Sequence, residues 1–281
     1  MADRPNILLI TTDQQRVDTI GAYGSTHVRT PNLDCLAGSS VVFERAYVQN
    51  TVCIPSRACI QTGRYTHQHG VRYMESLIDS TPGLPAHEKT FMGHLREAGY
   101  TTGATGKIHM MPERDFDYLE IVGGKGARWT QSTGQDIGPG PLGAQYATWL
   151  NKKHPGGYEA LYEQRRRPEY KQFRCSIISD IPLEEYVETY ILEKSIEFIE
   201  QPRDNPFFLW CGFCGPHGPH DPPASHADLY PFEDIKLPDT WEADLSDRPP
   251  FLRGRSPKAP MTPDEEAVMR RYMSYYFCLV T

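Results

Sequence analysis

The twelve-residue stretch from Cys53 to Arg64, Cys-Ile-Pro-Ser-Arg-Ala-Cys-Ile-Gln-Thr-Gly-Arg, constrains this chain more than any other part of its sequence. Pro55 fixes its own φ at a value that suits the first turn of a helix, and no further helix breaker occurs before Gly63. The spacing therefore predicts a helix that begins near Cys53 and ends at Gly63. Free amides at its N-terminus and their partial positive charge would then favour an anion beside Cys53.

Arg57 strengthens this expectation, because it follows Cys53 by four residues and so lies on the same helix face. Its guanidinium adds a fixed positive charge with planar hydrogen-bond donors. The helix N-terminus and Arg57 together predict a lowered pKa for the Cys53 thiol. The alternative is a small, buried, structural cysteine at the start of a proline-initiated helix, and this stretch alone leaves the two interpretations equally open.

Two predicted strands bring further polar residues to one sheet edge. The apolar run Asn6–Ile10 predicts a central strand that delivers Asp13 to the carboxyl edge, where open α/β sheets bind ligands. From spacing alone Asp13 is either a metal ligand or a helix cap, and the cap is favoured. Thr101–Thr105 predicts a second strand that ends near Lys107 and His109, which share one face if the strand continues. Without other information, these two residues fit a solvated loop better than a site.

A third strand is predicted at Pro206–Gly212, after the clearest amphipathic helix of the chain at Pro182–Gln201. The alternation of helix and strand predicts an α/β fold. The strand leads into Gly-Pro-His217-Gly-Pro-His220-Asp221, where the prolines would hold an extended segment along the sheet edge and present the imidazoles to a cleft. The same three polar side chains also raise the alternative of a metal cluster.

Net charge and cysteine usage exclude several classes of function and location. A net charge of -7 argues against nucleic acid or an anionic membrane as the main partner, so an anion must be bound locally. No stretch approaches membrane-spanning length, and the first apolar run is too short for a signal-peptide core. The seven cysteines are odd in number and scattered, which predicts a reducing cytoplasm. Cys211 and Cys214 have the spacing of a redox pair, but they follow a strand instead of preceding a helix, which disfavours that role.

Cys53-x-Pro-Ser-Arg57, followed after four residues by Thr-Gly-Arg, resembles the signature of the formylglycine-dependent sulfatase family of the alkaline-phosphatase-like superfamily. Gly106-Lys-x-His109 and the Pro-His-x-Pro-His run at His217 are similar to the family at the corresponding places. The resemblance implies a three-layer sandwich around a large mixed, mostly parallel central sheet. It also implies that a formylglycine-generating enzyme oxidises Cys53 to an aldehyde, whose hydrate supplies the nucleophilic oxygen.

The resemblance further implies roles for four side chains around that nucleophile. Lys107 would bind the sulfate group, and Arg57 would help to activate the nucleophile. His109 would take a proton from the nucleophile, and His217 would contact the sulfate ester and its leaving group. In this interpretation His220 is structural or lies behind the residues that touch the substrate.

A divalent metal is also implied, with Asp13, Gln14 and residue 53 among its ligands. Ca²⁺ is favoured, and Mn²⁺ and Mg²⁺ are alternatives. The family has an Asp pair at the first two positions, whereas Gln14 offers an uncharged carbonyl oxygen. Within a group that includes the arylsulfatases, this substitution resembles the choline sulfatase and phosphonate monoester hydrolase branches.

The resemblance covers residues 1–281 but only the N-terminal part of the family's catalytic domain. The family's later Asp-His or Asp-Asn pair and a further lysine have no counterpart here, although Thr262-Pro-Asp-Glu265 is a capping box that predicts one more helix. Residues 110–179 lack periodicity and are expected to form an irregular insertion, with Arg165–Arg167 as a solvated face. Val41–Tyr47 is expected to be a strand that leads toward Cys53.

The implied activity is hydrolysis of sulfate monoesters of aryl or small alkyl alcohols. Gln14 keeps open a phosphonate or phosphate monoester or diester hydrolase on the same fold. The absent C-terminal ligands keep open an inactive truncated fragment. The expected partners are a small-molecule sulfate ester and, transiently, the formylglycine-generating enzyme, and self-association into a homo-oligomer is left open.

Overall fold

A computed structural model of the chain describes residues 4–72, 83–109, 113–123, 144–238, 240, 244, 246–250 and 262–281. A four-stranded sheet lies at its centre, in the order β1-β4-β2-β3. The strands are β1 Ile7–Thr11, β2 Thr101–Gly106, β3 Tyr118–Ile121 and β4 Phe207–Gly212. All neighbouring strands pair in parallel, so the carboxyl ends of the four strands meet at one edge of the sheet.

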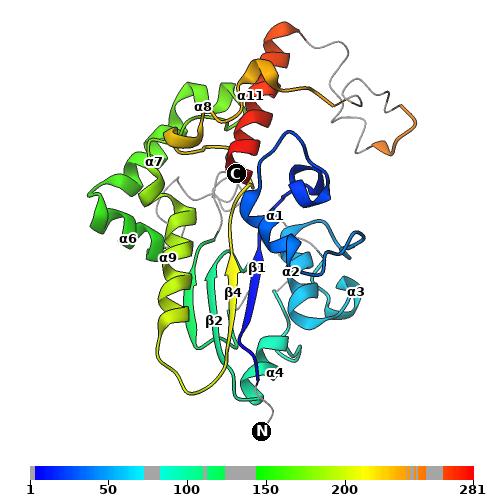
Figure 1. Ribbon diagram of the computed structural model, residues 1–281, viewed down its shortest axis with the longest axis vertical. Helices are drawn as coiled ribbons and strands as arrows, with labels where there is room; N and C mark the ends of the chain where they lie inside the picture. The colour runs from blue at the N-terminus through cyan, green and yellow to red at the C-terminus, as the bar shows by residue number, and fades with distance from the viewer. Residues whose placement is uncertain are drawn as a thin grey trace.

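Helices cover both faces of this sheet and make three layers (Figure 1). Helix α9, Val187–Glu200, packs on one face, and helices α2, Cys53–Thr62, and α4, Phe91–Glu97, pack on the other. Strand β4 is buried along its whole length, because alternate side chains enter different cores. Phe208 and Trp210 belong to the core under α2 and α4, and Leu209 packs with Phe198 of α9. The predicted α/β sandwich is confirmed.

Most predicted elements occur close to their predicted ends. Strand β1 is shifted by one residue at both ends, and β2 and β4 differ from the predicted ranges by one residue at one end. Helix α9 is preceded by a separate turn, η4, at Leu183–Glu185. Helix α11, Pro263–Val280, begins with the predicted capping box of Thr262 and Glu265. The other short helices and turns outside the predicted insertion are α1 Pro31–Gly38, α3 Thr66–His69, η1 Val17–Thr19, η2 Gly21–Tyr23, η5 Ala224–His226 and η6 Phe232–Asp234.

Two predictions about individual strands are wrong for the described residues. Strand β1 is an edge strand rather than a central one, and Leu8 and Ile10 are 46% and 52% exposed. Val41–Tyr47 forms no strand, and Phe43 is 70% exposed, because no described strand offers this segment a pairing partner. The described part of the sheet has four strands, and all of its pairs are parallel.

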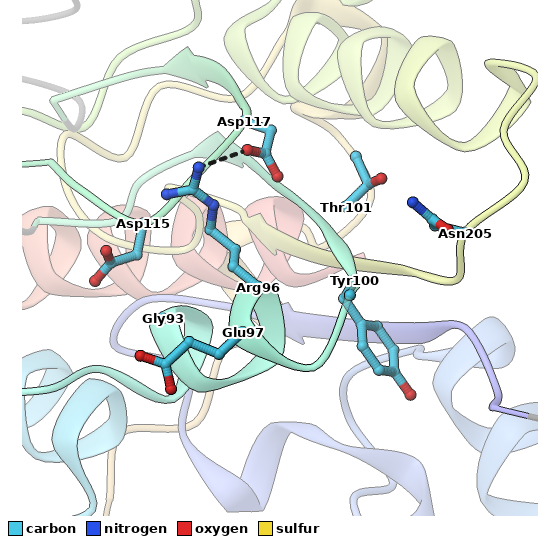
Figure 2. Close-up of a pocket in the computed structure, with 9 residues that line it drawn as sticks. Gly93, Arg96, Glu97, Tyr100, Thr101, Asp115, Asp117 and Asn205 are labelled. Atoms are coloured by element: carbon cyan, nitrogen blue, oxygen red, sulfur yellow. Dashed lines mark ion pairs between the residues drawn. The ribbon is translucent and has the colours of Figure 1, made fainter.

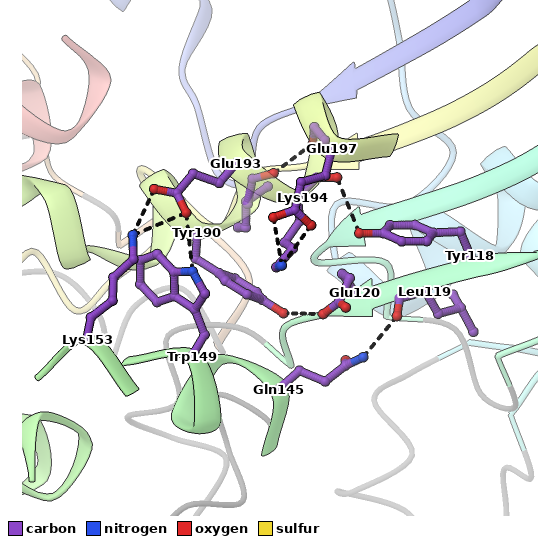
Figure 3. A network of polar contacts seen from close by, with 12 residues as sticks. Tyr118, Leu119, Glu120, Gln145, Trp149, Lys153, Tyr190, Glu193, Lys194 and Glu197 are labelled. Atoms are coloured by element: carbon purple, nitrogen blue, oxygen red, sulfur yellow. Dashed lines mark hydrogen bonds and ion pairs between the residues drawn. The ribbon is translucent and has the colours of Figure 1, made fainter. Parts of the chain in front are cut away.

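The predicted irregular insertion contains strand β3 and three helices where the structure describes it. Residues 110–112 and 124–143 lie outside the described residues, but three helices follow: α6 Ala144–Lys153, α7 Gly157–Arg166 and α8 Pro168–Gln172. Helix α6 is attached to α9 by polar contacts around Glu193, which accepts hydrogen bonds from Trp149 at 3.2 Å and Lys153 at 2.9 Å (Figure 3). Tyr190 of α9 in turn donates to Glu120 of β3 at 2.5 Å. Tyrosine and tryptophan side chains, which carry a polar group on an otherwise apolar ring, fill this interface. Because these residues are not purely apolar, the helical spacing of buried residues is not evident in the sequence.

Among the described residues, no helix combines the length and the apolar composition needed to cross a bilayer.

Candidate active site

Segments that leave three strands converge at the carboxyl edge of the sheet. Asp13 follows β1, Lys107 follows β2 directly, and the loop that carries His217 follows β4. The backbone amide of Asp13 donates to the carbonyl of Gly215 at 3.0 Å, which ties the end of β1 to the His217 loop. The parallel sheet thus brings together residues that are about 200 positions apart in the sequence.

A buried cluster of three charges lies at this edge. Lys107 Nζ is 2.7 Å from Asp13 Oδ2, and Arg57 Nη2 of helix α2 is 3.2 Å from the same oxygen. The three side chains are between 2% and 6% exposed. Burial alone would raise the pKa of the Asp13 carboxyl, but Lys107, Arg57 and His217 hold it below its usual value. With two cations around one carboxylate, the cluster is positive and suits an anionic ligand.

Cys53 is the first residue of α2, as predicted, and it is partly buried. Helix α2 also ends as predicted, at Gly63 with φ 66°. The predicted lowering of the thiol pKa is wrong. Burial raises the pKa of Cys53, and the nearby Asp13 adds to this effect, so the opposing charges of Lys107 and Arg57 are outweighed. The unmodified residue is therefore a neutral thiol near pH 7 and a poor nucleophile.

His109, three residues after the end of β2, adopts a left-handed backbone conformation with φ 51°. Its Nε2 donates to the carbonyl of Gly123 at 2.9 Å, so Nδ1 is the basic nitrogen of the neutral ring. Burial, reinforced by the positive charge of Lys107, lowers the pKa of His109 to about 3. The imidazole is consequently neutral at physiological pH.

His217 is partly buried, and its Nδ1 donates to the carbonyl of Gly218 at 2.6 Å. Its charge acts on Asp13, which places the two side chains in one electrostatic environment.

Gln14 has an exposed side chain and a left-handed backbone, with φ 59°. Tyr276 of α11 fixes this strained turn, because its hydroxyl donates to the Gln14 carbonyl and accepts from the Arg16 amide, both at 2.8 Å.

The sequence matches the Sulfatase family over residues 5–277. The chain belongs to the sulfatase family. Among curated relatives, it is 29% identical to an arylsulfatase of Clostridium perfringens over 84% of this chain and 48% of that protein. It is 30% identical to arylsulfatase G of Mus musculus over 80% of this chain and 44% of that protein. The chain thus spans about half the length of the curated relatives it matches.

Solved structures share the fold of this sulfatase-family chain. The phosphonate monoester hydrolase of Agrobacterium radiobacter superposes with a TM-score of 0.70 at 19% identity, over 99% of this chain and 56% of that one. A protein solved in complex with its substrate D-glucosamine-2-N,6-O-disulfate superposes with a TM-score of 0.65 at 18% identity, over 99% of this chain and 59% of that one. At these identities the likeness establishes the alkaline-phosphatase-like fold alone.

The described residues do not form a complete metal centre. They contain no group of three or more His, Cys, Asp or Glu side chains placed to hold an ion. Asp13, Gln14 and residue 53 supply at most half of the six or more oxygen ligands that Ca²⁺ requires. The contacted oxygen of Asp13 is also already paired with Lys107 and Arg57. A divalent cation at this place would need further donors from outside the described residues.

A pocket of about 620 Å³ elsewhere on the chain is not part of this site (Figure 2). It lies at the amino edge of the sheet, beside Thr101 at the start of β2, and none of the predicted catalytic residues lines it. An ion pair between Arg96 and Asp117, at 3.0 Å and partly exposed, crosses it. The catalytic candidates occupy the opposite, carboxyl edge.

His220 and Asp221, which follow His217 in the same loop, contact other side chains and do not form a cluster of metal ligands with His217. The ring of His220 packs edge-on against Tyr272, with a centroid distance of 4.3 Å, and Asp221 pairs with Arg165 at 3.2 Å. These contacts favour the structural interpretation of His220 and argue against a cluster of three metal ligands. They also correct the prediction that Arg165 lies on a solvated face, because the Arg165 side chain is 5% exposed.

Sequence reasoning missed Arg165 although a signal was present. Tyr158, Leu161, Tyr162 and Arg165 recur at the i, i+3, i+4, i+7 positions of one helix face, and all four are buried. The charge of Arg165 and of the two arginines that follow it makes this stripe resemble a polar surface in the sequence. Arg166 and Arg167 do remain at the surface, where they pair with Glu163 and Asp180.

Proposed function

We propose that the protein hydrolyses sulfate monoesters of aryl or small alkyl alcohols, using a formylglycine made from Cys53. The observation that carries this proposal is the buried positive cluster of Lys107, Arg57 and Asp13 at the N-terminus of α2, beside Cys53. Family membership and relatives that are named arylsulfatases support it.

Position 53 suits such a modification. The raised pKa leaves Cys53 as a neutral thiol, which would be a weak nucleophile if it stayed unmodified. Formylglycine supplies an aldehyde hydrate, whose two hydroxyl groups allow one oxygen to attack sulfur and the other to lose a proton afterwards. In this proposal Lys107 and Arg57, which both pair with Asp13, stabilise negative charge on the sulfate oxygens.

The two histidines divide the proton transfers in this proposal. His217 starts as the imidazolium and donates a proton through Nε2 to the oxygen of the departing alcohol, while its Nδ1–H stays engaged with the Gly218 carbonyl. His109 accepts a proton through Nδ1 from the remaining hydroxyl at position 53, so that sulfate can leave. The low pKa of His109 keeps the ring unprotonated over the whole physiological range.

A divalent cation is part of the proposal, with Ca²⁺ first and Mn²⁺ or Mg²⁺ as alternatives. Asp13, Gln14 and residue 53 would be its ligands on this chain, together with donors from outside the described residues. The proposed partners are a small sulfate ester and, transiently, a formylglycine-generating enzyme. We place the protein in the cytoplasm, a location that the odd number and scattered positions of its seven cysteines favour.

Kinetics on matched esters tests the proposal. The full-length protein, produced in a host with the maturation enzyme, should hydrolyse an aryl sulfate with a higher kcat/KM than the corresponding aryl phosphate and phosphonate. Mass spectrometry of the peptide that carries residue 53 should show the aldehyde, and Cys53→Ala should abolish the activity. A preference for the phosphonate would refute the sulfatase assignment.

Gln14 favours a second candidate, a phosphonate or phosphate ester hydrolase on the same fold, because its uncharged carbonyl reduces the negative charge of the metal site. A third possibility is a non-catalytic protein. An unmodified Cys53 thiol in protein from the competent host, together with no turnover of any of the three esters, would support it.

A further inference from the structure

We propose that Arg165 is a positioning residue for the reaction, which through Asp221 holds His217 at the leaving group. This inference rests on the proposed function. Arg165 lies on α7, within the segment predicted to be an irregular insertion, and Asp221 lies four residues after His217. The pair therefore connects the helical insertion to the catalytic loop.

Asp221 is held at both of its oxygens. Arg165 Nη2 lies 3.2 Å from Oδ2, and the hydroxyl of Tyr186 donates to Oδ1 at 2.9 Å. The Arg165 and Asp221 side chains are 5% and 3% exposed, so water does not compete for these contacts. The guanidinium also lies 5.6 Å from the ring centre of Tyr162 on the same helix.

The His217 loop is fixed on both sides of the histidine. Before it, Glu188 of α9 accepts hydrogen bonds from the amides of Cys214 at 3.2 Å and Gly215 at 2.7 Å. After it, the His220 amide donates to the Cys175 carbonyl at 2.9 Å. His217 thus lies in a span of a few residues between two anchors, and the Arg165–Asp221 pair is the charged part of the second anchor.

Stability alone does not account for this pair. Burying two charges costs several kcal/mol of desolvation per ion, and a buried ion pair often contributes no more net stability than apolar residues of similar volume. Buried pairs can instead fix one geometry among several. Here the geometry that depends on the pair is the placement of the His217 ring.

Substrates whose leaving groups differ in acidity can reveal whether Arg165 positions His217. An aryl sulfate with an acidic phenol, such as 4-nitrophenyl sulfate, needs little protonation of its leaving oxygen, whereas an alkyl sulfate needs it fully. Loss of the correct His217 position should therefore slow alkyl sulfates much more than 4-nitrophenyl sulfate. A general loss of folded protein would slow both substrates by the same factor.

The test compares Arg165→Met with wild type in the full-length, matured protein. We expect kcat for an alkyl sulfate to fall about 10-fold to 100-fold, within the range of a general-acid contribution, and kcat for 4-nitrophenyl sulfate to fall no more than about 3-fold. Arg167→Met is the matched control, because Arg167 lies just beyond the same helix and forms an exposed pair with Asp180. It should leave both rates within about 2-fold of wild type.

Tyr186→Phe keeps the inference testable if Arg165→Met fails to fold. It removes the hydrogen bond to Asp221 Oδ1 and keeps the ring. We expect the same selective loss on the alkyl sulfate, with a smaller factor of about 3-fold to 10-fold. Equal losses on both substrates, or no loss, in a folded variant would overturn the inference while the proposed function stands. A matured wild-type protein that hydrolyses neither ester would overturn both.

Discussion

Removal of the Asp13 carboxylate should destabilise the protein more than removal of either cation that surrounds it. At the 2.7 Å separation of Lys107 and Asp13, the attraction between the two unit charges is roughly 6 kcal/mol for an effective dielectric constant of about 20, before the desolvation cost. Asp13→Asn leaves Lys107 and Arg57 buried side by side without a counter-charge, so we expect a loss of about 3–5 kcal/mol. Lys107→Met leaves Asp13 paired with Arg57, and we expect a loss of about 1–3 kcal/mol.

Urea denaturation with EDTA present measures this difference, because EDTA removes any contribution from bound metal. Glu163→Gln is the control, since it breaks an ion pair with Arg166 in which both side chains are about half exposed. It should change the free energy of unfolding by no more than about 0.5 kcal/mol. If Lys107→Met proves more destabilising than Asp13→Asn, the reasoning that two unpaired cations dominate the cost is wrong.

Three further outcomes follow from other parts of the chain. Tyr276→Phe removes the hydroxyl that bridges Gln14 and Arg16, and it should lower the free energy of unfolding by about 1–3 kcal/mol in chemical denaturation. Calorimetric titration of Ca²⁺ into the 281-residue chain should show weak binding, and tight binding of one ion per chain would contradict the incomplete ligand set. Burial lowers the pKa of His69, so below about pH 6.5 the unfolded chain binds more protons than the folded protein. The free energy of unfolding should therefore fall as the pH drops below that value, and it should fall less steeply in His69→Gln. Thermal melts at several pH values measure this difference.

The helix at Cys53 was predictable from local chemistry alone. Pro55 and Gly63 act on their own backbone dihedrals, and those effects persist in any tertiary context. The same holds for the capping box of Thr262 and Glu265, which satisfies helix amides within four residues. Strands β2 and β4 were predictable because runs of small or apolar residues are bounded by breakers.

The failures arise where tertiary contacts decide the outcome. Sequence placed Cys53 beside positive charges correctly, but the extent of burial set the direction of its pKa shift. Arg165 differs from its neighbour Arg166 only in the direction of its side chain, and one is buried while the other pairs at the surface. Val41–Tyr47 has the composition of a strand, but a strand also requires a partner, which composition does not reveal.

The charge of the buried cluster does not by itself decide the choice of substrate. With His109 neutral, the charges of Lys107, Arg57 and Asp13 leave one net positive charge in a site from which water is largely excluded. A sulfate monoester carries one negative charge, as does a phosphonate monoester, whereas a phosphate monoester carries close to two near pH 7. These three residues alone match a single negative charge, but in the proposed function a divalent cation adds two positive charges and protonated His217 adds another, so charge balance does not rank the three esters. Under that proposal, the geometry around position 53 decides between sulfate and phosphonate esters.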